Sequence, residues 1–193
     1  PTIESAQGVF TDGWAEHAAA AQMRVDLLQR AGHQGVPTFF DPGPGNPALE
    51  NGWHREAIGA TQVLLLNGEE ARRLTGIESP RDSLNALGQM GPELIIVKLG
   101  ANGCLARRGE ETVELPGIPV PLVDATGAGD SVAGAVIYAW LRGLDLTSLV
   151  RLANAAGAAK VQKRGTGRNV PTLDEIRAVL QRTEGGPAEL LPG

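Results

Sequence analysis

The chain has 193 residues, of which 42% are hydrophobic and 20% charged, so it can bury one core and is neither of the disordered nor of the fibrous class. Its net charge of -5 argues against a nucleic-acid partner, because general affinity for nucleic acid needs a basic face. The single Cys104 cannot form an internal disulfide, and no segment is apolar over the roughly 18 residues of a membrane span, so we expect a cytoplasmic protein without a membrane partner.

The first half of the chain alternates between helix and strand patterns. An Ala-rich helix is predicted over residues 14–32, followed by a short buried strand at 36–41. A second cycle leads from a helix at 48–60 to an apolar strand at 61–67, and a third leads through 69–91 to a strand at 93–100. This alternation predicts an α/β fold with a mainly parallel sheet and helices on both faces.

The second half begins with a hairpin pattern over residues 103–117, with Arg108 and Glu110 near its turn. Three helices are then predicted, at 127–141, 146–162 and 173–182. We expect a single domain over residues 1–193, with a loosely held tail at 184–193.

Polar residues follow three of the predicted strands. Asp41 and Asn67 end two of them, and Lys98 with Gly100 ends the third. Ligands of open α/β sheets bind beyond the carboxyl ends of the strands. These residues therefore predict an active site along one edge of the sheet.

The stretch "VDATGAGDSVAGAV", residues 123–136, joins small residues and two carboxylates to the start of a helix. Gly127 and Gly129 allow positive φ values and a close approach to a ligand, and a helix start presents N–H groups that bind anions. Asp130 could accept a proton beside such an anion, which suggests phosphoryl transfer. Simple capping of a Gly-rich helix start explains the local pattern equally well.

The segment "DATGAGDSVAGAV" closely resembles the second signature of the PfkB, or ribokinase-like, carbohydrate kinases. The segments "LLLNGEEARRLTG", "IIVKLGANGCL" and "ANAAGAAKVQKRG" resemble further parts of the same family, in the same order. The resemblance implies a ribokinase-like three-layer sandwich. It also implies an ATP-dependent kinase that transfers the γ-phosphate to a hydroxyl of a sugar or sugar acid.

The resemblance also implies roles for individual residues. Asp130 is similar to the catalytic base, and the backbone N–H groups of Ala128, Gly129 and Asp130, reached through Gly127, are similar to an anion hole. The other implied roles are a hydrated Mg²⁺ held by Asn67 and Glu70, a nucleotide site at Lys98, Gly100, Gly103 and Asn154, and a monovalent cation such as K⁺ at Asp124 and Thr126.

Each of these residues also has a purely structural interpretation. Glu70 could be a solvated acid in the first turn of its helix, and Lys98 could extend its ammonium group into water from a strand end. Asn154 could be a packing or surface residue of an Ala-rich helix. Cys104 is predicted to be a small buried hydrophobic residue and not a nucleophile.

Three rival motifs fail on their own chemistry. "GPGNPA", residues 43–48, matches a dinucleotide fingerprint, but its two prolines remove N–H donors where pyrophosphate would bind. "GDSVA" is close to a hydrolase elbow with Ser131 as nucleophile, but no His follows His54 in the chain. A Walker-type phosphate loop is absent from the sequence.

The main departure from the family pattern lies at the front of the chain. It opens on "PTIESAQGVF", without Met, and nothing resembles the Gly-Gly segment or the small β lid that make most sugar contacts in the family. We therefore expect the C-terminal part of such a kinase, and a non-catalytic remnant that binds nucleotide or a partner chain stays open as an alternative. The "DPGPGNP" loop leaves Asp41 as the substrate candidate, and dimerisation through a lid stays open.

Overall fold

The computed structural model describes residues 2–15, 17–43, 52–183 and 190–191. Its six strands form one mixed sheet in the order β1-β2-β3-β4-β5-β6, which confirms the predicted α/β class. The chain divides into two compact units, Pro1–Val97 with Ala106–Thr112 and Lys98–Leu105 with Val113–Gly193. The expectation of a single domain stays a prediction, and each unit is described by itself.

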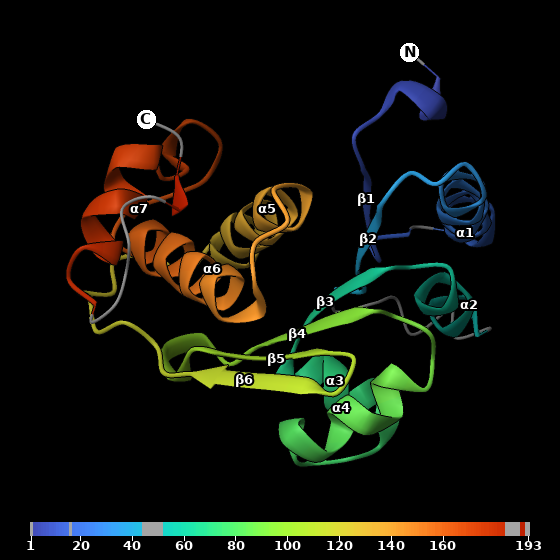
Figure 1. Cartoon of the computed structure of the whole chain (residues 1–193), viewed down its shortest axis with the longest axis horizontal. Coiled ribbons are helices and arrows are strands. Elements are labelled where there is room, and N and C mark those ends of the chain that lie inside the picture. The colour runs from blue at the N-terminus through green and yellow to red at the C-terminus, as the bar shows by residue number, and fades with distance from the viewer. Residues whose placement is uncertain (1, 16, 44–51, 184–189, 192–193) are drawn as a thin grey trace. The chain divides into compact units, whose positions relative to one another are not determined.

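The first unit alternates strands and helices along the chain (Figure 1). Its elements are a short 3-10 turn η1 (Ile3–Ser5), β1 (Val9–Asp12), α1 (Ala18–His33), β2 (Thr38–Asp41), α2 (Trp53–Gly59), β3 (Val63–Asn67), α3 (Gly68–Thr75), α4 (Pro80–Gly88) and most of β4 (Leu94–Lys98). The predicted strands at 36–41, 61–67 and 93–100 each contain one of these strands, because apolar runs bounded by turn residues carry a strong local signal.

Parallel pairing in this unit follows chain order. Phe39 of β2 pairs with Phe10 of β1 on one side and with Val63 of β3 on the other. Residues 63–66 of β3 are fully buried, as expected for a strand whose apolar run is continuous and not alternating. Each connection between these strands leads to the neighbouring strand, always in the same direction across the sheet. Because such crossovers are right-handed, the helices α1 to α4 all lie on one face of these strands (Figure 1).

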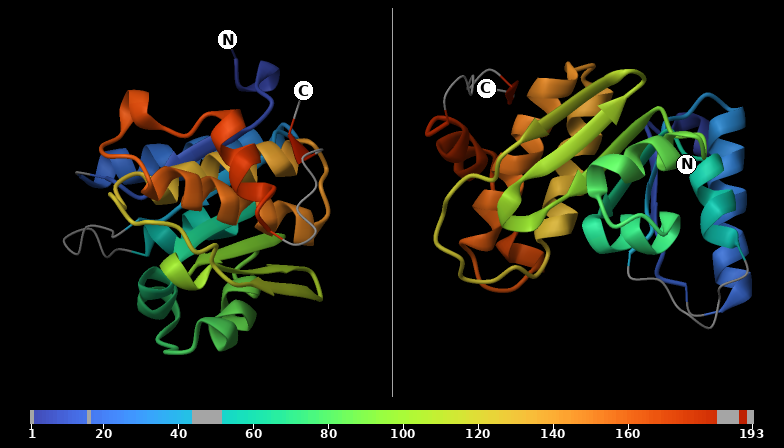
Figure 2. Two further views of the ribbon diagram at one scale, coloured as in Figure 1. Left: turned by 90° about the vertical axis from the view of Figure 1, so that its left-hand side faces the viewer. Right: turned by 90° about the horizontal axis from the view of Figure 1, so that it is seen from below.

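The second unit contains the base of a hairpin and three longer helices (Figure 2). Its elements are η3 (Gly100–Asn102), the ends of β5 (Cys104–Arg108) and β6 (Glu111–Leu115), α5 (Ala128–Leu141), α6 (Leu146–Val161), η4 (Gly167–Asn169) and α7 (Leu173–Leu180). The hairpin turn falls between Arg108 and Glu111, as predicted. The three helices predicted in this unit are confirmed to within one residue at each start, whereas α1 and α2 of the first unit begin four and five residues later than predicted. Of the predicted loose tail, residues 184–189 and 192–193 lie outside the described residues.

Small side chains let α5 and α6 approach each other closely. Half of the buried residues of the two helices are alanine, and a β-carbon added at Gly157 of α6 would lie only 3.1 Å from Cγ2 of Val132 on α5. Interiors are packed as densely as crystals, so this interface leaves little freedom for sliding. It therefore sets the last turn of α6 against the first turn of α5.

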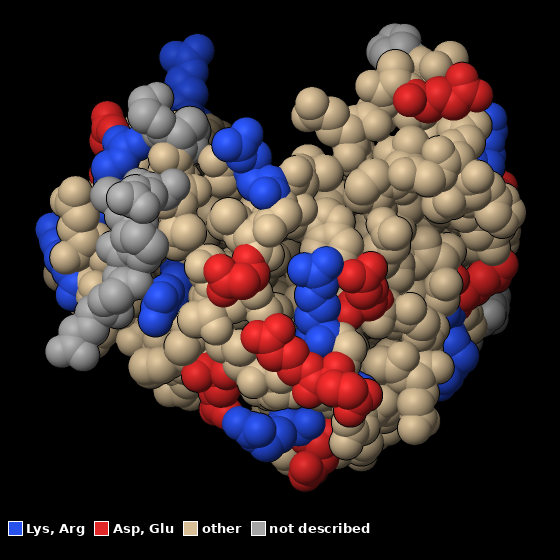
Figure 3. All heavy atoms as spheres, viewed as in Figure 1, with Lys and Arg blue, Asp and Glu red and all other residues tan. Residues whose placement is uncertain are grey.

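Charged side chains of both signs are interspersed on the face drawn in Figure 3, without a broad basic surface. None of the described helices is long and apolar enough to cross a lipid bilayer.

Asp145 provides a pH-dependent test of the start of α6. Its carboxylate accepts a hydrogen bond of 2.9 Å from the Ser148 backbone N–H, and its bonds to the side chain and backbone of Ser148 hold its pKa below the ordinary value. A lowered pKa means that this stabilisation is complete above the unfolded-state pKa of about 4 and is lost as the pH falls through the folded-state pKa.

We expect Asp145→Ala to lower the free energy of unfolding by about 1 kcal/mol at pH 7, with a smaller difference from the wild type below about pH 4. Urea denaturation across this pH range measures the effect. Asp145→Asn, which keeps an uncharged cap, is the control and should cost less than the alanine variant at pH 7. An alanine penalty that grows toward low pH would contradict the assignment.

Candidate functional site

The N-terminus of α5 begins at a glycine and carries no side-chain cap. Gly127 is the N-cap residue with a φ of 77°, a left-handed conformation that disfavours any residue with a β-carbon. A β-carbon there would also lie 2.9 Å from Cγ2 of Thr166. Simple side-chain capping therefore does not account for this motif, and the helix start stays open for another acceptor.

The backbone N–H groups at this helix start differ in availability. The N–H of Ala128 donates to the carbonyl of Ala125 at 3.1 Å. Helix geometry directs the next N–H groups, those of Gly129 and Asp130, out of the helix end, because the first turn lacks carbonyl partners within the helix. These two groups are the better candidates for an anion hole.

A lysine adds positive charge at the same place. Nζ of Lys98, at the end of β4, would lie 3.6 Å from a β-carbon added at Gly129. The positive end of the helix dipole acts in the same direction as this ammonium group. The second unit thus brings Lys98, Gly127 and Gly129 together in an arrangement that favours an anion.

A cavity of about 520 Å³ opens beside this helix start, within the second unit. This volume lies in the usual range of small-molecule sites, about 300–1,000 Å³. Its walls are mostly apolar, with few polar groups, and all four residues predicted for the nucleotide site belong to them. The lining residues that serve the argument are Lys98, Gly100, Gly103, Gly117, Gly129 and Asn154.

Two close backbone approaches shape one wall of this cavity. A β-carbon on Gly103, which has a φ of 97°, would lie 2.1 Å from the carbonyl oxygen of Leu115, and one on Gly117 would lie 2.1 Å from that of Ala101. The buried Asn154 side chain donates to the carbonyls of Leu115 and Pro116 at 3.3 and 3.1 Å. Asn154 therefore has a structural role in the cavity wall, and Gly117 is a functional candidate that sequence reasoning missed.

The two acidic residues of the motif have different surroundings. Asp130 has an exposed side chain at the mouth of α5. Asp124 accepts hydrogen bonds from Oγ1 and the N–H of Thr126 at 2.7 and 2.9 Å and from the N–H of Gly165 at 2.7 Å. These bonds, with that from the Thr126 hydroxyl first, hold the pKa of Asp124 far below its ordinary range. Asp124 thus ties the loop before α5 to the loop after α6.

Ser131 does not behave as a nucleophile in this arrangement. Its hydroxyl donates to the carbonyl of Gly127 at 3.0 Å, one helical turn back. Together with Asp130 it borders a second cavity of about 340 Å³, whose other walls are largely apolar. Such walls offer few partners for a ligand rich in hydroxyl groups.

The remaining candidate residues belong to the first unit. Asn67 is the N-cap of α3, and its side chain accepts from the N–H of Glu70 at 2.9 Å while Glu70 accepts from the N–H of Asn67 at 2.7 Å. Glu70 is only 5% exposed, so it is not the solvated first-turn acid of the structural interpretation. Asp41 ends β2 and accepts from the N–H of Gly43 at 3.1 Å.

The oxygens of Asn67 and Glu70 are of the hard kind that Mg²⁺ prefers, so the residues present fit a hydrated Mg²⁺. Among the described residues, no three His, Cys, Asp or Glu side chains cluster closely enough to hold a metal ion by themselves. Of the rival "GPGNPA" motif, residues 44–48 lie outside the described part of the chain.

Comparison with known proteins adds independent information. A family model described as "pfkB family carbohydrate kinase" matches residues 3–173. The chain is 31% identical over 132 residues to an uncharacterized sugar kinase of Archaeoglobus fulgidus, covering 68% of this chain and 52% of that protein. It is 31% identical over 165 residues to a ribokinase of Mus musculus, covering 81% of this chain and 50% of that protein.

The fold has close counterparts among solved structures. A putative ribokinase II of E. coli, in complex with ATP and Mg²⁺, matches with a TM-score of 0.83 at 24% identity, covering 94% of this chain and 60% of that one. This likeness shows a ribokinase-like fold. The chain spans about half the length of the two curated relatives above, 52% and 50%.

The cavity wall makes a paired prediction about glycines. Gly100, with a φ of 61°, has no atom within 4 Å of an added β-carbon, whereas Gly103 meets the Leu115 backbone. Gly100→Ala should cost about 1 kcal/mol of unfolding free energy for its left-handed φ, and Gly103→Ala about 3 kcal/mol or more because backbone must also move. Urea denaturation of both variants measures the difference, and equal losses would refute the close approach.

Cys104 should be unreactive in the folded protein. Its side chain is 2% exposed, and burial raises the pKa of its thiol to about 12, against a weaker opposite effect of the Lys98 charge. We expect less than about one tenth of a thiol per chain to react with Ellman's reagent at pH 8 before denaturation, and one thiol after it. Rapid modification of the native protein would show that this wall of the cavity opens.

Proposed function

Because the chain belongs to the pfkB family of carbohydrate kinases, we propose that it carries the nucleotide-binding and catalytic portion of an ATP-dependent kinase. The reaction is transfer of the γ-phosphate to a hydroxyl group of a sugar or sugar acid. One observation carries the proposal: the uncapped start of α5, with Gly127 in the left-handed conformation and Lys98 beside Gly129, opens on a cavity of about 520 Å³.

In this proposal the nucleotide occupies that cavity. Lys98, Gly100, Gly103 and Asn154 belong to its walls, and the glycines let ligand atoms approach the backbone without interference from side chains. The E. coli relative, which was solved with ATP and Mg²⁺, supports the choice of nucleotide for this family. The mostly apolar walls suit a base and a ribose, and the helix start suits the phosphates.

Phosphoryl transfer then depends on the mouth of α5. The N–H groups of Gly129 and Asp130 and the ammonium group of Lys98 stabilise the charge on the migrating phosphoryl group, which is the main requirement of its loose transition state. Asp130 accepts the proton of the attacking hydroxyl. Its exposed side chain at this mouth supports that role, because the acceptor must reach it from solvent.

We assign Asn67 and Glu70 to a hydrated Mg²⁺, which when bound would neutralise phosphate charge. Asp41 stays the candidate substrate contact from the first unit. A cytoplasmic location and small-molecule substrates without a nucleic-acid partner stay predictions.

Asp130→Asn tests the catalytic role directly. We expect ATP-dependent phosphorylation of the best sugar in a panel to fall by about a hundredfold or more, while the affinity for ATP with Mg²⁺ changes by less than about twofold, because the N–H groups remain. Coupled assays and isothermal titration calorimetry measure the two effects.

Asp82→Asn is the matched control, since Asp82 lies in the first turn of α4 at the same helical position that Asp130 has in α5 and is likewise exposed. It should leave the rate unchanged. Retained activity in Asp130→Asn would refute the base. Nucleotide binding without turnover of any sugar by the wild-type chain would favour the non-catalytic remnant.

A further inference from the structure

Lys160, in the last turn of α6, is buried in an unusual way for a charged residue. Its side chain is 0% exposed, and among the lysines and arginines that the structure describes it alone is fully buried. Removing an ammonium group from water is costly unless nearby negative charge or hydrogen bonds compensate. Such a residue therefore calls for a physical explanation.

The contacts of Lys160 place it beneath the start of α5. Its Nζ donates to the carbonyl of Lys163 at 3.1 Å, and its Cε would lie 3.5 Å from a β-carbon added at Gly127. Its charge also contributes to lowering the pKa of the Asp124 carboxyl. The ammonium group thus lies between the loop after α6 and the glycine at the N-cap of α5.

The ammonium group of Lys160 contacts the loop after α6, which borders the proposed anion hole. Asp124 accepts a hydrogen bond from the N–H of Gly165, and Lys160 donates one to the carbonyl of Lys163. Thr166, which follows Gly165, places its methyl group 2.9 Å from the β-carbon added at Gly127. Both charged groups therefore fix the same turn, residues 163–166, against the helix start.

We propose that the buried ammonium group of Lys160 takes the place of a bound monovalent cation behind the anion hole, so that this chain needs no K⁺. The resemblance to the family implies a monovalent cation at Asp124 and Thr126. The inference rests on the proposed function, because it concerns the anion hole of that function. Lys160 is a positioning residue in this scheme. It acts through the turn and through Gly127, and it does not touch the phosphoryl group.

The residues present fit a cation poorly for two reasons. Both carboxylate oxygens of Asp124 already accept hydrogen bonds, from Thr126 and from Gly165. In addition, a second positive charge at Asp124 would be repelled by Lys160, whose charge already acts on this carboxylate. The ammonium group of Lys160 supplies a positive charge at this place, so no ion has to be bound from solution.

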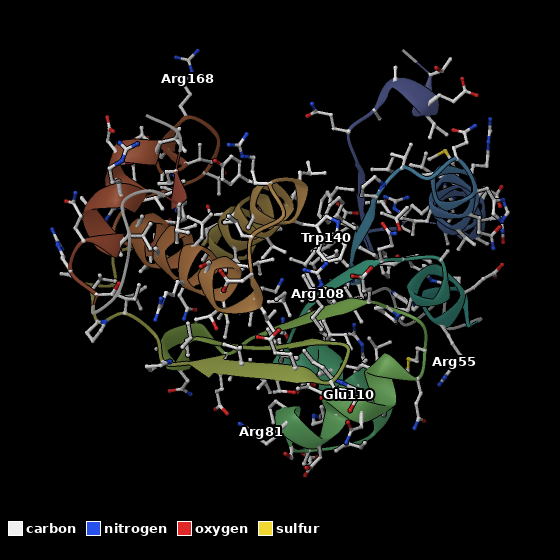
Figure 4. The ribbon with its side chains drawn as sticks, in the orientation of Figure 1. Arg55, Arg81, Arg108, Glu110, Trp140 and Arg168 are labelled. Atoms are coloured by element: carbon white, nitrogen blue, oxygen red, sulfur yellow. The ribbon has the colours of Figure 1, made fainter. Side chains whose placement is uncertain are left out.

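The neighbouring cations of the same loop behave differently. The ammonium group of Lys163 forms an ion pair of 2.8 Å with Glu175 and is 25% exposed. Arg168 extends away from the ribbon (Figure 4) and is exposed. Lys163 therefore offers a matched control: it belongs to the turn that Lys160 contacts but directs its charge to Glu175 of α7.

The test compares nucleotide binding and thermal unfolding in KCl and in tetramethylammonium chloride of equal ionic strength. For the wild-type chain, we expect the affinity for a non-hydrolysable ATP analogue with Mg²⁺ to differ by less than about twofold between the salts, and the melting temperature not to change. A wild-type chain that binds more than about fivefold better in KCl, or melts about 3 °C higher in it, would overturn the proposal.

Two substitutions separate charge from bulk. Lys160→Ala should lose about tenfold in affinity in tetramethylammonium and should recover it in KCl or ammonium chloride, because the vacated volume admits a small cation. Lys160→Met should show the same loss without recovery, because its side chain fills the volume. Lys163→Ala should show neither the loss nor any dependence on the cation.

The following results would contradict the proposed role of Lys160. Wild-type affinity in Lys160→Met, or a loss in Lys160→Ala that neither cation repairs, would assign the residue a packing role only. If no variant and no wild-type chain binds the nucleotide, the proposed function fails, and the melting temperature still decides about Lys160: KCl should raise it by about 3 °C in Lys160→Ala and not in the wild type. Equal cation effects on both would overturn the inference.

Discussion

The concentration of positive potential at an uncapped helix start is the constraint on which the second unit depends. A glycine with a φ of 77° begins α5, two lysines lie near that glycine and Gly129, and no side chain forms a capping hydrogen bond at this helix end. Gly127 adopts the left-handed conformation without the clash of a β-carbon, and open N–H groups at a helix start gain hydrogen bonds when an anion binds. A bound anion would complete this arrangement, and this is the physical basis of the proposed kinase function.

The small residues of α5 and α6 serve that constraint. Close helix packing brings the end of α6 to the start of α5, so the turn at residues 163–166 can contact Gly127. Lys160 lies at helical spacing from the buried Leu149, Ala153 and Ala156 of α6, so it continues a buried stripe of that helix. Packing thus decides where the charge lies, and the charge stabilises the carboxylate that ties down the loop.

Structural and functional roles coincide in several candidate residues. Asn154 supports the cavity wall through the carbonyls of Leu115 and Pro116, and Asn67 with Glu70 caps α3. A side chain that is held by such bonds loses little further freedom when a ligand arrives, and this preorganisation favours binding. The structural interpretation is therefore correct for the contacts of Asn154, whereas Glu70 is a buried capping residue and not a solvated acid. These contacts do not compete with a role in the site.

Local pattern alone determined the α/β class, the order of strands and helices, the hairpin turn and the helix that begins in the glycine motif. It did so because apolar periodicity, turn glycines and Asp or Thr caps act over a few residues. A resemblance in four short segments was enough to indicate the family.

Only the tertiary structure decided which of these residues meet. The bond from Gly165 to Asp124 joins positions 41 residues apart, and those from Asn154 reach back 38 and 39 residues. Lys160 is spaced like the apolar residues of α6 that are buried, which is a local signal in the sequence. Its partners, however, lie on a turn and on another helix. Contacts of this kind depend on how closely two helices approach, which is set by the packing of many side chains and not by any one segment.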